Sequence, residues 1–119
     1  MRRAYGDPRR LTPEIHAHYL EALPTPEDRE GSAVFPRRIV GSTPWLRRLA
    51  DGLPALADTP TLIVWGMRDI AFRATELRRW QSLFPVARTV RLGDVGHYVQ
   101  EEAPERLSDE VAAFLGQRA

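Results

Sequence analysis

The stretch "LIVWGMRDIAF", residues 62–72, decides the fold of this 119-residue chain. The run from residue 59 to residue 66 is rich in β-branched and aromatic side chains and is bounded by proline and glycine. This pattern predicts a strand that is buried on both faces. Asp69 follows three positions after the glycine, among further apolar residues. A carboxylate in such surroundings needs a partner.

Downstream of this strand, helix and strand patterns alternate. Residues 74–84 have the spacing of a helix, residues 87–97 predict a second strand with Val90 and Leu92 facing inward, and residues 104–118 predict a last helix. Strand, helix, strand and helix with short loops form the unit of a parallel α/β sheet, so we expect an α/β fold. The apolar stripes that we expect to face the core are Leu77, Trp80 and Phe84 in the first helix, and Leu107, Val111, Phe114 and Leu115 in the second.

The first half of the chain contains several prolines, and its apolar spacing predicts short helices. The segment 11–23 predicts a helix capped by Thr12, and the segment 44–57 predicts another that breaks near its end. Between them, the segment 26–40 favours one or two short helices broken by Gly31 and Pro36.

Composition narrows the classes of function. The 17 basic residues are all arginine, and they are interleaved with 16 acidic ones, so the overall field is weak and a nucleic-acid partner is not expected. The chain has no cysteine and no apolar run long enough for a membrane span, and we expect a cytoplasmic, soluble protein. His16 and His18 lie two positions apart in the expected helix, so their side chains point to nearly opposite sides, and no third metal ligand is obvious. We therefore expect neither a metal nor another cofactor.

Functional side chains of parallel sheets collect beyond the carboxyl ends of the strands. Asp69 and His97 both lie at this edge, and adjacent strands would bring them within reach. A carboxylate bound to an imidazole fixes the ring's tautomer and orientation, as a general base requires. Two plainer readings remain open, since Asp69 can be a turn or cap residue and His97 can cap the next segment. Asp94 is expected to hold its own loop rather than compete for His97.

The stretches "PTLIVWGMRDIAF" and "GDVGHYVQEEAPE", together with the final helix containing "FL", resemble the C-terminal portion of an α/β-hydrolase. The further segments "GMRDIAF" and "LTPEIHAHYLEALPTPEDREGSAVFPRRI" are most similar to haloalkane dehalogenases and related epoxide hydrolases. The resemblance implies that residues 1–57 end a helical cap and return to the core, and that residues 58–119 form the last β-α-β-α part of that core. It also implies that Asp69 is the acid and His97 the base of a catalytic triad.

The sequence departs from this family at the nucleophile. In this family the nucleophile sits in a strained turn with the pattern Gly-x-Ser/Asp-x-Gly, where x is any residue. No serine or aspartate of this chain lies in that pattern. The tryptophans at 45, 65 and 80 are therefore expected in the core rather than at a halide site. We expect a C-terminal fragment, from a truncation, a split gene or an internal start, that is inactive alone. It would act on a small-molecule substrate once completed by an N-terminal half, or self-associate through exposed core surface. The alternative is a non-catalytic interaction module, and the identity of the nucleophile stays open.

Overall fold

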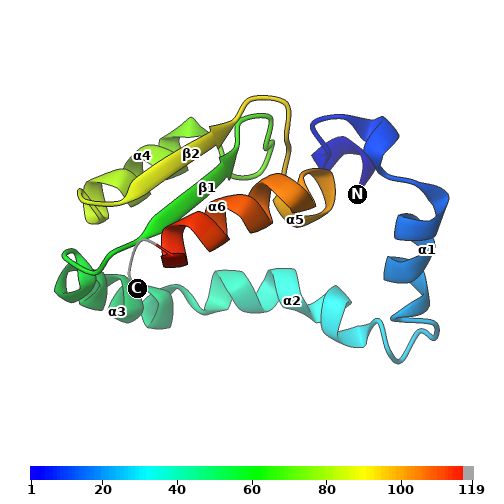
Figure 1. The fold of residues 1–119 in the computed structure, drawn as a ribbon. Helices are drawn as coiled ribbons and strands as arrows, with labels where there is room; N and C mark the ends of the chain where they lie inside the picture. Colours follow the sequence, from blue (N-terminus) through cyan, green and yellow to red (C-terminus); the bar gives the residue numbers. More distant parts are fainter. Residues whose placement is uncertain (117–119) are drawn as a thin grey trace. The chain divides into compact units, whose positions relative to one another are not determined.

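The computed structural model describes residues 1–116, which form two compact units (Figure 1). The strand unit comprises Met1–Leu11 together with the chain from Ala57 onward, and the helical unit comprises Thr12–Leu56. The first eleven residues thus pack with the strands rather than with the helices that follow them. Whether the two units correspond to the cap and core expected from the sequence stays a prediction.

The strand unit contains one parallel pair of strands. Strand β1 spans Leu62–Gly66 and pairs with β2, Arg88–Leu92, in a register that sets Leu62 opposite Arg88 and Gly66 opposite Leu92. Figure 1 shows helix α4, Ala74–Leu83, beside β2, and helix α6, Pro104–Gly116, across the other side along β1. The predicted order of strand, helix, strand and helix is confirmed. A short helix α5, Val99–Glu102, and two 3-10 turns, η1 at Arg2–Ala4 and η2 at Pro8–Arg10, complete the unit.

The core of this unit lies under the ends of the strands. Leu92, Val95 and Ala103 are buried together, and Val64, Val90 and Val99 pack against them. The inward orientation predicted for Val90 and Leu92 is therefore confirmed. The prediction that β1 is buried on both faces holds only in part, because Ile63 and Gly66 are buried whereas the other three residues are half-buried.

The predicted apolar stripe of α6 is only half covered. Leu107 and Phe114 are half-buried, whereas Val111 and Leu115 are exposed. In α4, Leu77 and the following Phe84 are buried and Trp80 is exposed. Apolar side chains at helical spacing show which face a helix would bury, but the 116 described residues do not supply enough structure to cover all of these faces.

The helical unit consists of α1, Pro13–Glu21, α2, Glu30–Gly41, α3, Thr43–Gly52, and the 3-10 turn η3, Leu53–Leu56. Thr12 caps α1 as predicted, because its hydroxyl oxygen accepts a hydrogen bond from the Ile15 amide at 3.3 Å. The break predicted near the end of the segment 44–57 is also present, as the change from α3 to η3 after Gly52.

The prediction of short helices broken at Gly31 and Pro36 is wrong, because α2 runs through both residues. Gly31 lies in the first turn of α2, and a single glycine costs a helix only about 1 kcal/mol relative to alanine, which does not by itself end it. The fixed φ of Pro36 is compatible with a helix, and its ring removes one hydrogen bond from the ladder without ending it.

Within residues 1–116, no helix combines the length and the apolar character needed to cross a bilayer.

Candidate active site

The loops that follow β1 and β2 lie against each other. The Met67 amide donates to the Leu92 carbonyl and the Arg68 amide donates to the Val95 carbonyl, each at 2.9 Å. This approach requires glycine at position 66, because a Cβ there would lie 2.0 Å from the Gly96 carbonyl oxygen. The parallel pairing is thereby extended past the strands, and both loops leave the sheet at the same edge.

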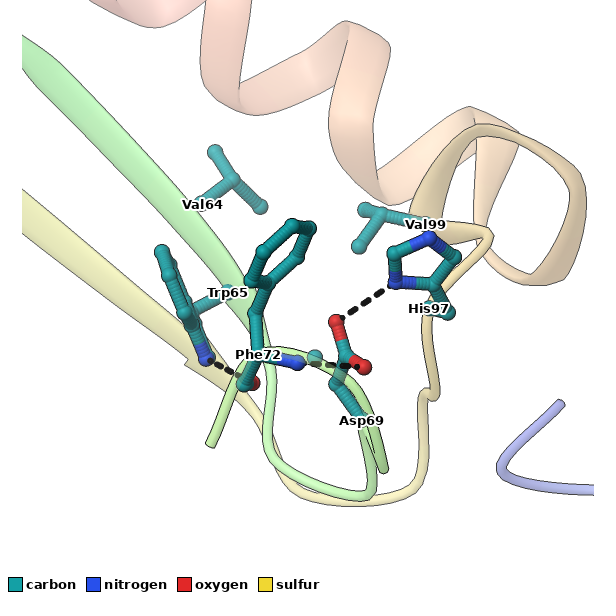
Figure 2. Close-up of a pocket in the computed structure, with 7 residues that line it drawn as sticks. Val64, Trp65, Asp69, Phe72, His97 and Val99 are labelled. Atoms are coloured by element: carbon teal, nitrogen blue, oxygen red, sulfur yellow. Dashed lines mark hydrogen bonds and ion pairs between the residues drawn. The ribbon is translucent and has the colours of Figure 1, made fainter. Parts of the chain in front are cut away.

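Asp69 and His97 meet at this edge, as expected from the sequence. Asp69 Oδ2 lies 2.9 Å from His97 Nδ1 (Figure 2). The other carboxylate oxygen, Oδ1, accepts hydrogen bonds from the amides of Ala71 at 2.7 Å and Phe72 at 3.0 Å. A carboxylate only accepts hydrogen bonds, so the ring nitrogen that faces it carries the hydrogen. The Asp69 side chain is 9% exposed and that of His97 is 32% exposed, so the acid is shielded and the imidazole remains accessible.

The pair borders an open pocket of about 230 Å³. The other lining residues are Val64, Trp65, Gly66, Phe72 and Val99. Figure 2 shows His97 Nε2 on the side of the ring away from Asp69, and the Phe72 ring beside the pair. The centroids of the Phe72 and His97 rings are 5.4 Å apart. The site therefore places a partly exposed imidazole beside an otherwise apolar surface.

The three tryptophans do not share the core position predicted for them. Trp45 and Trp80 are 53% and 42% exposed. Trp65 lines the pocket, and its indole Nε1 donates to the Phe72 carbonyl at 3.2 Å (Figure 2). That bond holds the loop carrying Asp69 and Phe72 close to the end of β1. The sequence did not reveal this role, because a tryptophan in an apolar strand reads first as packing.

Asp94 holds its own loop, as predicted. Two nitrogens of the Arg106 guanidinium donate to it at 3.0 Å, and Arg10 donates to its Oδ2 at 2.7 Å. These hydrogen bonds, with that of Arg106 the stronger influence, hold the pKa of Asp94 well below its usual range. The loop that carries His97 is thus tied to α6 and to the N-terminal segment.

The loop before His97 needs glycine at position 96 because another backbone segment lies close to it. A Cβ on Gly96 would lie 2.3 Å from the Ala4 carbonyl oxygen, whereas one on Gly93 would meet no atom within 4 Å. None of the glycines in residues 1–116 has a positive φ, so close approach, and not a left-handed backbone, accounts for glycine at position 96.

The N-terminal segment is the part of the site that sequence reasoning missed. The His97 amide donates to the Ala4 carbonyl at 2.7 Å, and Arg68 Nη1 donates to the Gly6 carbonyl at 3.1 Å. No periodic or motif signal pointed to these contacts, which join residues more than 60 positions apart. Among residues 1–116, no group of three or more histidine, cysteine, aspartate or glutamate side chains is arranged to hold a metal ion.

Residues 1–104 match the family described as alpha/beta hydrolase fold. The chain therefore belongs to the α/β-hydrolase family, and two parallel strands with their helices are consistent with part of that fold. It is 37% identical over 113 residues to haloalkane dehalogenase 2 of Mycobacterium tuberculosis and to that of Mycobacterium bovis. It is also 40% identical over 70 residues to a cis-3-alkyl-4-alkyloxetan-2-one decarboxylase of Xanthomonas campestris.

These matches cover unequal shares of the proteins compared. The dehalogenase match covers 93% of this chain and 40% of the relative, and the decarboxylase match covers 59% and 23%. The chain thus spans well under half the length of the curated relatives that it matches.

Proposed function

We propose that this chain supplies the acid and the base of a haloalkane dehalogenase-like hydrolase, with Asp69 as the acid and His97 as the base. The observation that carries the proposal is the 2.9 Å contact between Asp69 Oδ2 and His97 Nδ1 at the edge of a small pocket. The likeness to dehalogenases over 93% of the chain supports the choice within the family.

In this proposal His97 works through Nε2. Asp69 keeps the hydrogen on Nδ1, so the lone pair of Nε2 is free to take a proton. With an aspartate nucleophile, Nε2 removes a proton from water as the water oxygen attacks the carbonyl carbon of the covalent ester. The C–O bond to the substrate alcohol then breaks, and the proton on Nε2 passes to the departing alcohol oxygen, which returns the ring to its neutral form. With a serine nucleophile, Nε2 takes the hydroxyl proton instead. In both cases Asp69 stabilises the imidazolium that forms.

The pocket lining indicates the kind of substrate. Val64, Phe72 and Val99 present hydrocarbon beside the catalytic pair. An apolar surface of this kind favours a small organic molecule with a hydrocarbon skeleton, which is the chemistry named in the haloalkane dehalogenase relatives. The nucleophile and the oxyanion donors have to come from outside these 119 residues, because the elbow pattern is absent from the sequence. Without those groups, which act as a unit with the base, the chain alone is expected to be inactive.

Complementation tests the proposal. The chain is mixed with the part of the M. tuberculosis relative that precedes the matched region, and halide release and ester hydrolysis are both measured. Turnover is expected only in the mixture, and it should disappear with His97→Ala. His16→Ala, at an exposed histidine in α1, is the matched control and should retain turnover. Turnover that survives His97→Ala would overturn the proposal.

A non-catalytic interaction module is the second candidate. The observation that favours it is the amount of exposed apolar surface, which includes Phe35, Trp45 and Trp80. Stable binding of the complementary part without any turnover, in a mixture whose components are each folded, would support the module and count against the enzyme.

A further inference from the structure

Glu102, at the end of α5, is a buried carboxylate that holds three backbone amides. It is only 6% exposed. Its Oε1 accepts from the Gly96 amide at 2.9 Å, and its Oε2 accepts from the amides of Gly6 at 2.8 Å and Asp7 at 3.3 Å. A buried carboxylate is costly unless it is hydrogen-bonded, so these contacts account for its presence in the core.

The two oxygens join segments that are far apart in sequence. Gly96 directly precedes His97, whereas Gly6 and Asp7 belong to the N-terminal segment, which lies next to α5 in Figure 1. The same segment accepts the His97 amide at the Ala4 carbonyl, 2.7 Å away. Two successive backbone amides are thus held: that of Gly96 by the Glu102 side chain, and that of His97 by the Ala4 carbonyl.

Arg10 adds a further link to this network. One guanidinium nitrogen donates to the Glu102 carbonyl oxygen at 3.1 Å and the other donates to Asp94 at 2.7 Å. The end of α5, the loop before His97 and the N-terminal segment are therefore held as one cluster. None of these polar groups lines the pocket.

We propose that Glu102 is a positioning residue for His97, acting through the Gly96 amide and residues 4–7. It sets the loop so that Nδ1 faces Asp69 and Nε2 faces the pocket. The inference rests on the proposed role of His97 and extends it to a residue that does not touch the reacting groups. A shift of the loop by a fraction of an ångström would lengthen the 2.9 Å contact and release the ring tautomer.

Glutamine at position 102 removes half of this arrangement while it keeps the size of the side chain. The carboxylate has two accepting oxygens and serves amides on both sides. An amide side chain has one accepting oxygen, and its NH₂ group would face another N–H on the remaining side. One of the two connections must therefore break.

Two measurements on the full chain, made at low temperature, test the inference. Hydrogen exchange followed by mass spectrometry reports the loop at residues 93–98, and NMR of ¹⁵N-histidine-labelled protein reports the tautomer of His97, with His97→Ala assigning the signal. In Glu102→Gln, exchange of the loop should accelerate about tenfold, which corresponds to the loss of one buried hydrogen bond. The fraction of His97 with hydrogen on Nδ1 should fall at the same time.

Glu105→Gln is the matched control, because it makes the same change at an exposed position in the first turn of α6, and it should leave both readouts as in the unmodified chain. Gly6→Ala attacks the other side of the cluster, where a Cβ would lie 2.6 Å from the Asp94 carbonyl oxygen, and should reproduce the effect of Glu102→Gln.

An unchanged His97 tautomer in a folded Glu102→Gln chain would overturn the positioning role, even if the loop exchanges faster. General loss of helical circular dichroism in Glu102→Gln and Gly6→Ala would also overturn it, since Glu102 would then be a residue of the fold as a whole. The separate variant Asp69→Asn tests the proposed catalytic pair. If Asp69→Asn leaves the His97 tautomer unchanged, the proposed catalytic pair is contradicted, independently of the result for Glu102→Gln.

Discussion

Asp69 uses each of its oxygens for a different purpose. Oδ1 accepts two amides of its own loop and is fixed by them, so Oδ2 is held in place to meet His97. The plain reading of Asp69 as a turn residue is therefore confirmed, and it is compatible with the functional role that we propose for the same side chain. The turn provides the rigidity that an orienting carboxylate needs.

Asp69→Asn preserves the shape of this side chain and tests its charge. The asparagine amide can present an N–H to the ring, which would favour the tautomer with hydrogen on Nε2 and leave no base facing the pocket. In the complemented enzyme we expect turnover to fall on the order of 10³–10⁴-fold with little change in KM. Steady-state kinetics checks this, and a loss below tenfold would contradict the role given to Asp69.

Gly66 gives a second prediction for a single residue. Gly66→Ala forces a Cβ against the Gly96 carbonyl oxygen, whereas Gly93→Ala meets open space. We expect Gly66→Ala to cost about 1–3 kcal/mol through overpacking and to speed hydrogen exchange of residues 66–72 and 93–97. Gly93→Ala should leave that exchange near its original rate. Equal exchange in the two variants would show that the loops do not need their close approach.

The elements of the strand unit are joined by charged residues at the edge of the sheet. Asp94 connects the loop after β2 with Arg106 of α6 and with Arg10 of η2. Asp7 caps η2 by accepting from the Arg9 amide, and its hydrogen bonds from Arg9 lower its pKa to about 2. Both acids therefore stay ionised well into the acidic range.

These lowered pKa values predict an acid sensitivity. A carboxyl whose pKa is lower in the folded chain than in the unfolded chain stabilises the fold above its unfolded value, ~4, and loses this contribution as the pH falls through its folded value. The stability of the strand unit should therefore decline below about pH 4. Asp94→Asn should be less stable than the unmodified chain at pH 7 and should lose less on acidification. Circular dichroism during an acid titration checks this, and identical profiles for the two proteins would contradict it.

The whole molecule leaves much apolar surface open. Exposed large side chains occur in both units, among them Trp45 and Leu49 in α3, Trp80 in α4 and Leu115 in α6. Within residues 1–116, the two-stranded sheet also leaves backbone groups unpaired at its outer edges. In α4 and α6 these side chains belong to the apolar stripes that the sequence predicts should be covered. The curated dehalogenase relatives are more than twice as long as this chain.

For the isolated chain we therefore expect loose packing and self-association. Thermal unfolding should be broad, and sedimentation should show larger species as the concentration rises. Addition of the complementary part of the M. tuberculosis relative should sharpen the transition and reduce self-association. A cooperative, concentration-independent transition of a monomer would contradict this expectation.

The sequence alone determined the order of the strands and helices after residue 58, the parallel pairing, and the two residues that meet at its edge. It did so because local apolar periodicity and the geometry of parallel strands depend on near neighbours along the chain. The continuity of α2 was missed because glycine and proline usually weaken a helix, and the local pattern does not show that this helix continues through Gly31 and Pro36.

Only the tertiary structure decided what surrounds His97. The contacts of Glu102 with Gly6, of His97 with Ala4 and of Arg10 with Asp94 join residues more than 80 positions apart. A buried carboxylate and an exposed one look alike in sequence, as Glu102 and Glu105 of "QEEAPE" do. What separates them is which backbone amides the fold brings to each oxygen, and that depends on the path of the whole chain rather than on its local pattern.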